Sequence, residues 1–231
     1  AYSDKATALA EAKDPEGAAV MARQAVRFDP LLADPLEILG DPTSLERAVQ
    51  LDPYHSGHRF RLAVSLQLRA DYHGALREAE AALKAQPMVS AYYTKVAELQ
   101  GLLLIQALHE GDLPAARQMG KNLLALGQAF TARKAVADPL QHLWNSPKLR
   151  MDDLFKLRYG QGLFLAGDRA SAEPLLKEAA KSGLLGSEAH VWLYAIYEQR
   201  GDTKAMAELA TKPWIRFRQQ NPVFKAISSW K

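Results

Sequence analysis

The chain contains no cysteine among its 231 residues. Disulfide frameworks, thiolate metal sites and thiol nucleophiles are therefore excluded. The chain also lacks a strong excess of charge of either sign. Its 29 lysines and arginines and 26 acidic residues leave a formal net charge of only +3. So small a surplus does not indicate nucleic-acid binding, and we expect no nucleic-acid partner.

Long hydrophobic runs and targeting signals are missing as well. The best apolar stretch, from Gly101 to Leu108, is far shorter than the ~18 residues that a membrane-spanning helix requires. The chain begins at Ala1 with no initiator methionine and no signal-peptide pattern. We therefore expect a longer parent protein, with any membrane attachment in a part that precedes this sequence.

The sequence also lacks the motifs of common catalytic and metal sites. There is no glycine-rich phosphate loop, no Gly-x-Ser-x-Gly elbow and no His-Glu-x-x-His helix. His55 and His58 are spaced as two metal ligands on a helix would be, but no third ligand can be placed beside them. Asp152 and Asp153 are better explained as helix-capping residues than as paired catalytic carboxylates. We expect no enzymatic activity, no cofactor and no metal.

What the sequence does have is a repeated pattern of small residues. Ala63, Ala75, Ala82 and Pro87 follow one another at intervals of 12, 7 and 5 residues. Apolar residues recur at helical spacing on both sides of a short turn at 70–72, which predicts a helix hairpin. Alanine lets two helices approach closely where they cross, and proline ends the second helix.

The same spacing returns along the chain with a period of 34 residues. Pro53 and Pro87 are 34 residues apart, and so are the Gly-Asp turns that begin at Gly167 and Gly201. Small residues at these offsets, Gly-Asp turns and this period resemble the tetratricopeptide repeat. The resemblance implies an all-α fold, a right-handed superhelical solenoid of helix hairpins.

Departures from the period divide the chain into five segments. We expect degenerate N-terminal units over 1–53, two hairpins over 54–126 with the second lengthened, an irregular insert over 127–152, two hairpins over 153–213 and a C-terminal cap over 214–231. Within 1–53, the second repeat is too short to contain a proper first helix. The insert contains an Asp-Pro and a Ser-Pro pair, which predict a loop with a short helix.

In the tetratricopeptide family the first helix of each repeat lines a concave groove, and the resemblance assigns such positions to this chain. They are Phe60, Arg61, Val64, Gln67, Lys95, Glu98, Arg158, Gln161, Trp192 and Glu198. Because three cations share one repeat position, we expect a partly basic groove with tryptophan at its edge. It would suit a protein or an acidic peptide, or an anionic glycan. The other interpretation is an ordinary solvated helix face.

The last segment mixes aromatic with basic residues and has no acidic ones. It can be interpreted as a membrane-surface segment, since aromatic side chains favour the interface and cations attract anionic lipid. It can also be a helix that covers the open end of the solenoid, because Trp214, Phe217, Phe224 and Ile227 recur at packing intervals. We expect the cap.

A second resemblance concerns the parent protein. A first unit ending Arg27-Phe-Asp-Pro30 is followed by a short link, then by 45–54 and a regular repeat. This order resembles the soluble repeat tail of bacterial O-antigen ligase and polymerase-like membrane proteins. It implies a periplasmic domain, tethered to the inner membrane, that recruits partners or positions glycan in lipopolysaccharide biosynthesis. The alternative is a free-standing adaptor, cytoplasmic or periplasmic, that binds a peptide of a secretion, pilus or envelope complex.

Overall fold

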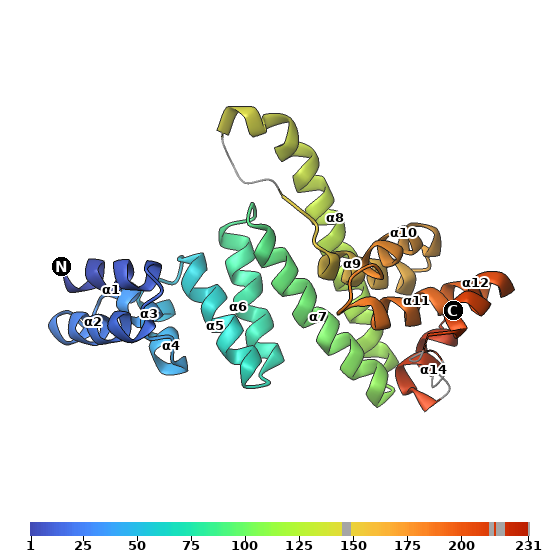
Figure 1. The fold of residues 1–231 in the computed structure, drawn as a ribbon, viewed down its shortest axis with the longest axis horizontal. Coiled ribbons are helices and arrows are strands. Elements are labelled where there is room, and N and C mark those ends of the chain that lie inside the picture. The colour runs from blue at the N-terminus through green and yellow to red at the C-terminus, as the bar shows by residue number, and fades with distance from the viewer. Residues whose placement is uncertain (145–148, 213–214, 216–219, 231) are drawn as a thin grey trace. The chain divides into compact units, whose positions relative to one another are not determined.

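The structure, a computed structural model, describes residues 1–144, 149–212, 215 and 220–230, without the side chains of 139–144. The described residues form helices joined by turns, and none of them lies in a strand (Figure 1). The all-α prediction is therefore confirmed. The helices fall into two compact units, Ala1–Pro87 and Met88–Lys231, and each unit is considered by itself.

The first unit consists of three helix hairpins. They are α1 (Tyr2–Glu11) with α2 (Pro15–Phe28), α3 (Ala33–Leu39) with α4 (Pro42–Leu51), and α5 (Ser56–Leu68) with α6 (Tyr72–Ala85). The short α3 differs from the expectation, because the second hairpin has a first helix after all. This helix has only seven residues, so it fits between Pro30 and the helix that ends before Pro53. Pro35 lies in its first turn, where the missing backbone N–H costs no hydrogen bond.

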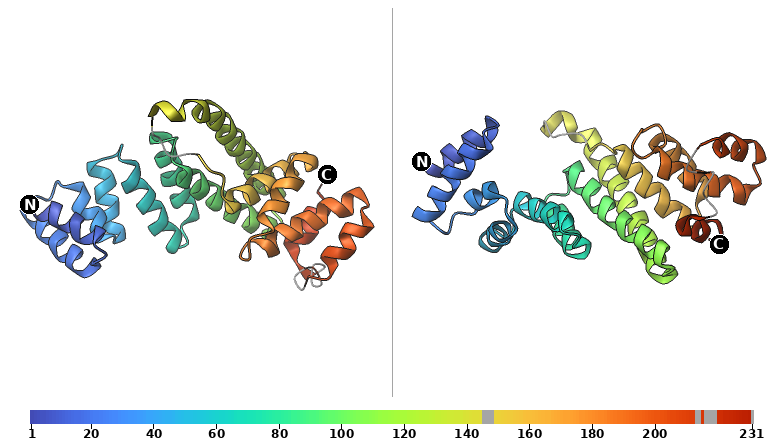
Figure 2. Two further views of the ribbon diagram at one scale, coloured as in Figure 1. Left: turned by 45° about the horizontal axis from the view of Figure 1, so that its top comes forward. Right: turned by 60° about the horizontal axis from the view of Figure 1, so that its bottom comes forward.

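The second unit also pairs successive helices, and the first two of them are much longer than any helix of the first unit (Figures 1 and 2). Its helices are α7 (Ser90–Glu110), α8 (Leu113–Trp144), α9 (Asp153–Leu165), α10 (Arg169–Ala179), α11 (Gly186–Arg200), α12 (Thr203–Ala210) and α14 (Pro222–Ser228). Helix α7 has 21 residues against 13 in α5. Helix α9 packs against α7 as well as α8, so the lengthened hairpin covers it from two sides.

The middle of the chain is more regular than the sequence suggested. Helix α8 runs without a break to Trp144, so most of the insert expected over 127–152 extends a helix rather than forming a loop with a short helix. A residue before proline is only biased away from the helical conformation. Many strong helix formers precede Asp138, and they favour continuation. The Ser-Pro pair of this segment lies outside the described residues.

The Gly-Asp turns have one recurring geometry. The first residue takes a left-handed conformation, with φ of 89° at Gly167 and 61° at Ala70. The aspartate that follows caps the next helix, as when Asp168 accepts the N–H of Ser171 at 3.0 Å. Five aspartates repeat this cap: Asp14, Asp71, Asp112, Asp168 and Asp202. The repeat signature is thus a helix stop followed directly by a helix start.

The predicted small residues lie where the helices of each hairpin meet. Ala63, Ala75 and Ala82 are all 0% exposed, and so are Ala116 and Ala172 in the second unit. A larger side chain at any of these positions would force the paired helices apart. The alanine pattern is therefore a packing requirement of the hairpins.

The chain ends in a cap on the second unit, as expected. Phe224 of α14 packs with Ile215 and with Tyr194 of α11, and Trp230 just beyond α14 is 6% exposed. Trp214 and Phe217, which were part of the same prediction, lie outside the described residues. Within the described part of the chain, no helix combines the length and apolar character that crossing a membrane would take.

Candidate binding clefts

A surface cleft of about 560 Å³ lies in the first unit, between the second hairpin and α5. Three of the predicted groove residues line it, namely Phe60, Arg61 and Val64. Its other lining residues are Gly40, Leu45, Ser65 and Leu68. Gln67, predicted with them, is half-buried on α5 and is not part of the lining. Three of the predicted groove residues therefore line a concave surface, and their role in binding stays a prediction.

The chemistry of this cleft is mostly apolar. Leu68 is 84% exposed, so most of its apolar side chain is in contact with water. Arg61 is the cation of the cleft, with 58% of its side chain exposed. Its Nε lies 2.6 Å from Oε1 of Glu37, so the carboxylate of Glu37 partly neutralises the positive charge of Arg61. The cleft is accordingly less basic than the sequence suggested.

The next two predicted residues, Lys95 and Glu98, form an ion pair with each other. Both belong to α7, and the lysine Nζ lies 2.6 Å from the carboxylate Oε2. Their side chains are only 15% and 27% exposed. The pair follows from their spacing of three residues on one helix. Neither residue lines the first-unit cleft or the cleft beside α10 and α11.

Arg158 and Gln161 are buried, which corrects the prediction that they face a groove. They are 5% and 0% exposed. Arg158 donates hydrogen bonds to Gln161 and to Glu188, and Gln161 Nε2 donates to the same Glu188 oxygen at 2.7 Å. The reason is the lengthened α7–α8 hairpin, which covers the α9 face that a regular repeat leaves open.

Trp192 is also buried, so it does not form the expected aromatic edge. It is 0% exposed and meets Phe164 in a T-shaped contact with ring centroids 5.3 Å apart. Six consecutive residues, 192–197, are buried, so α11 is covered on all sides over that stretch. Glu198, one residue further, is exposed at the end of the same helix.

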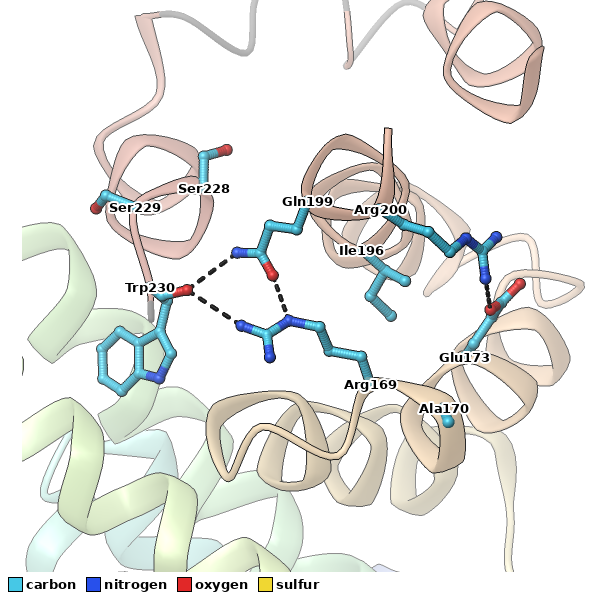
Figure 3. Close-up of a pocket in the computed structure, with 9 residues that line it drawn as sticks. All are labelled: Arg169, Ala170, Glu173, Ile196, Gln199, Arg200, Ser228, Ser229 and Trp230. Atoms are coloured by element: carbon cyan, nitrogen blue, oxygen red, sulfur yellow. Dashed lines mark hydrogen bonds and ion pairs between the residues drawn. The ribbon is translucent and has the colours of Figure 1, made fainter. Parts of the chain in front are cut away.

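A second cleft, of about 700 Å³, was not predicted from the sequence. It lies between α10, α11 and the segment after α14 (Figure 3). It is lined by Arg169, Ala170, Glu173, Ile196, Gln199, Arg200, Ser228, Ser229 and Trp230. No motif marks these residues, since they come from three distant segments. The surplus of aromatic and basic residues near the C-terminus was the only available signal.

One wall of this second cleft is the C-terminal segment itself. The backbone oxygen of Trp230 accepts hydrogen bonds from Arg169 Nη2 at 3.2 Å and from Gln199 Nε2 at 3.0 Å (Figure 3). The indole Nε1 of Trp230 donates to the backbone oxygen of Leu165 at 3.0 Å. Arg117 lies over the indole ring, 5.3 Å from its centroid. These contacts fix the end of the chain to α8, α9, α10 and α11.

The opposite wall is a charged cluster around Glu173. Its carboxylate lies 2.7 Å from Lys177 Nζ and 2.8 Å from Arg200 Nη1. The hydrogen bond from Lys177, followed by that from Arg200, lowers the pKa of Glu173 below its ordinary value. Burial raises the pKa of neighbouring Tyr197. Each charge in the cluster has an opposite partner, an arrangement that suits structure better than catalysis.

A third feature is a group of polar side chains in the first unit. Glu37, His55 and His58 each offer one ligand atom, and these atoms all lie within 4.8 Å of one another. The sequence had supplied the two histidines without a third ligand. Glu37 comes from α3, 18 residues before His55, so only folding brings it to them.

Comparison with known proteins places the fold. No family model matches the chain, and no curated protein matches its sequence. The crystal structure of MamA protein aligns with a TM-score of 0.53 and 15% identity, over 78% of this chain and 88% of that one. A structure from the functional characterization of PilF of Pseudomonas aeruginosa aligns with a TM-score of 0.55 and 13% identity, over 100% and 96%. Both are tetratricopeptide-repeat structures, so the chain has a tetratricopeptide-type fold.

Proposed function

We propose that the chain is a non-catalytic scaffold that binds a segment of another protein in the first-unit cleft. The cleft itself is the observation that carries this proposal. Phe60, Val64 and Leu68 present apolar surface around a concavity, and Arg61 supplies a donor at its rim. Tetratricopeptide-type scaffolds are suited to this role because stacked hairpins expose the faces of successive helices.

The partner we propose is a peptide with an apolar anchor and a nearby carboxylate. An apolar anchor removes the exposed Leu68 from water, which is favourable in proportion to the area buried. A carboxylate can accept hydrogen bonds from Arg61, whose guanidinium is more than half exposed. An anionic glycan, the other candidate from the sequence, would leave the apolar lining unused.

The test is a selection of peptides from a displayed random library on the immobilised full chain, followed by affinity measurements. Leu68→Ser should weaken the selected peptides at least tenfold, because it removes exposed apolar surface without disturbing the core. Leu184→Ser is the matched control, since Leu184 is 93% exposed and lies in the second unit. Equal affinity for the wild type and Leu68→Ser, or selection of no peptide, would refute the proposal.

The origin of the chain is a separate proposal. We propose a periplasmic domain of an O-antigen ligase or polymerase-like membrane protein, supported by the order of motifs from Arg27 to Tyr54. Membrane attachment and proximity to glycan would then belong to the parent protein. The free-standing adaptor of a secretion, pilus or envelope complex is supported equally by the fold, and it allows a cytoplasmic location.

Reading the gene upstream of Ala1 separates these two origins. Several encoded apolar stretches of ~20 residues would support the membrane-protein tail. A start codon or a single signal peptide just before Ala1 would contradict it and favour the adaptor. Neither outcome changes the expectation for Leu68→Ser, so the two proposals fail independently.

A further inference from the structure

The two histidines and the glutamate of the first unit have a geometry that goes beyond packing. His58 is 1% exposed, and its Nδ1 contacts Oε2 of Glu37. His55 is the N-cap residue of α5, and its ring centroid lies 3.9 Å from that of His58. Two imidazoles and one carboxylate thus converge on one place, from the end of α3 and the start of α5.

The contact between His58 and Glu37 requires something positive between the two acceptors. A neutral imidazole nitrogen with a lone pair and a carboxylate oxygen would repel each other, so a proton lies between them in this geometry. A metal ion would take the place of that proton with the two ligand atoms moved further apart. A proton accounts for this contact. His55 lies beside this pair because its Nδ1 accepts the backbone N–H of His58 at 3.3 Å, so Nε2 is the ring nitrogen that it would offer to a metal.

A second carboxylate lies near the other ring nitrogen of His58. Its other ring nitrogen, Nε2, lies 3.7 Å from Oδ1 of Asp34. With a metal on Nδ1, the ring proton would remain on Nε2 and face this carboxylate. A carboxylate behind a ligating histidine fixes the tautomer and raises the basicity of the ligand. Asp34 would serve as this outer partner, one helical turn before Glu37.

Glycine at position 57 places no side chain beside His55 and Glu37. A Cβ built on Gly57 would lie 3.0 Å from Cε1 of His55 and 4.0 Å from Oε2 of Glu37. The missing side chain therefore keeps open the region between two of the three ligands. Nothing in the backbone of α5 demands glycine here, since Gly57 has no positive φ.

We propose that Glu37, His55 and His58 form a binding site for a divalent transition-metal ion, of which Zn²⁺ is the best fit. Two imidazoles and one carboxylate are a common zinc donor set, and they leave a fourth position open for water or a partner's side chain. Calcium and magnesium, which prefer oxygen ligands, should not bind. Arg61 also contacts Glu37, through Oε1, which leaves Oε2 for the metal.

The site would connect two helix hairpins of the first unit. Glu37 belongs to α3 and both histidines to α5, so an ion would join the second hairpin to the third. Metal binding should therefore raise the unfolding temperature of the protein. This inference does not depend on the proposed peptide-binding function.

Titration of the untagged full chain with zinc chloride, followed by calorimetry and thermal unfolding, tests the proposal. We expect one Zn²⁺ per chain and a higher unfolding temperature. His55→Asn removes a ligand but keeps a good helix cap, so this variant should fold normally and bind zinc at least tenfold more weakly. Gly57→Ala and Asp34→Asn should also weaken zinc binding while leaving all three ligands in place.

His73→Ser is the matched control, because His73 is an exposed histidine of the same unit outside the group. It should bind zinc as the wild type does. Magnesium chloride is the control for general cation binding and should have no effect. Absence of saturable zinc binding by the wild type, or unchanged binding by His55→Asn, would overturn the proposal. The contact between His58 and Glu37 would then be a hydrogen bond only.

Discussion

Gly101 of α7 and Arg158 of α9 are in direct contact, and the glycine makes the arginine's position attainable. A Cβ added to Gly101 would lie 2.2 Å from Nε and 2.3 Å from Cδ of Arg158. The arginine side chain therefore crosses α7 at the one point where α7 has no side chain. From there it reaches Glu188 of α11, so one residue connects three helices of the second unit.

Gly101→Ala should destabilise the second unit by about 1–3 kcal/mol, the usual cost of adding a methyl group to a packed core. The clash involves the middle of the arginine side chain, which is held at its far end and cannot move away easily. Gly183→Ala is the control, because a Cβ there would meet nothing within 4 Å. Urea unfolding of both variants measures the difference, and equal stability would show that Arg158 has another position available.

Arg158→Ala should destabilise the protein by about 3 kcal/mol, the low end for removing one partner of a buried ion pair, because Glu188 keeps some contact with water. The side chain of Glu188 is 29% exposed. Stability is therefore the property that changes, and affinity for peptides selected on the first-unit cleft should be retained. Urea unfolding and peptide titration of the same variant check both statements. Lost affinity with unchanged stability would restore Arg158 as a groove residue.

Trp230→Ala should release the C-terminal segment and cost about 3–5 kcal/mol, as for other large buried aromatic residues. The indole loses its contact with Arg117 and its hydrogen bond to Leu165. Hydrogen exchange of α14 should accelerate in this variant. Lys225→Ala, an exposed change on the same helix, should leave exchange unchanged. Equal exchange in the wild type and Trp230→Ala would mean that the cap is held by Phe224 and Ile227 alone.

Because of the charged cluster around Glu173, we expect the second unit to lose stability at acidic pH. The pKa of Glu173 is lowered in the folded protein from its ordinary value of 4.5, chiefly by Lys177. Its contribution to stability is therefore complete above pH 4.5 and is lost as the pH falls through the lower, folded value.

Glu173→Gln should accordingly destabilise the protein at pH 7, and the difference from the wild type should shrink below pH 4.5. Urea unfolding at several pH values measures this difference, with Glu208→Gln, exposed on α12, as the control. A difference that does not change with pH would show that Glu173 acts through packing rather than through its charge.

The turns and crossings of the fold were predictable because their causes are local. An aspartate such as Asp168 caps a helix with a backbone N–H three residues away, and Gly167 supplies the left-handed conformation just before it. Ala63 and Ala75 lie in one hairpin, so short-range spacing alone identifies them. The length of α8 was not predictable from its Asp-Pro pair, because such a pair only biases the residue before proline away from the helical conformation.

The predicted groove positions that line a cleft all belong to one regular repeat. Phe60, Arg61 and Val64 line a cleft in the first unit, as the family pattern implies. Arg158 and Trp192 occupy equivalent positions but are buried, because α9 and α11 have additional neighbours. A repeat pattern specifies which face of its helix a residue occupies. It does not specify what covers that face.

The helix hairpins, their turns and the all-α class could be predicted, because they depend on residues close together along the chain. Which helix faces remain open could not be predicted, because that depends on the packing of segments far apart in sequence. Glu37 meets His55 and His58 only after α3 packs near α5, and Trp230 meets Arg169 only after the chain returns to α10. Burial and the meeting of distant polar groups are properties of the packed chain. The second cleft and the proposed metal site both arise in this way.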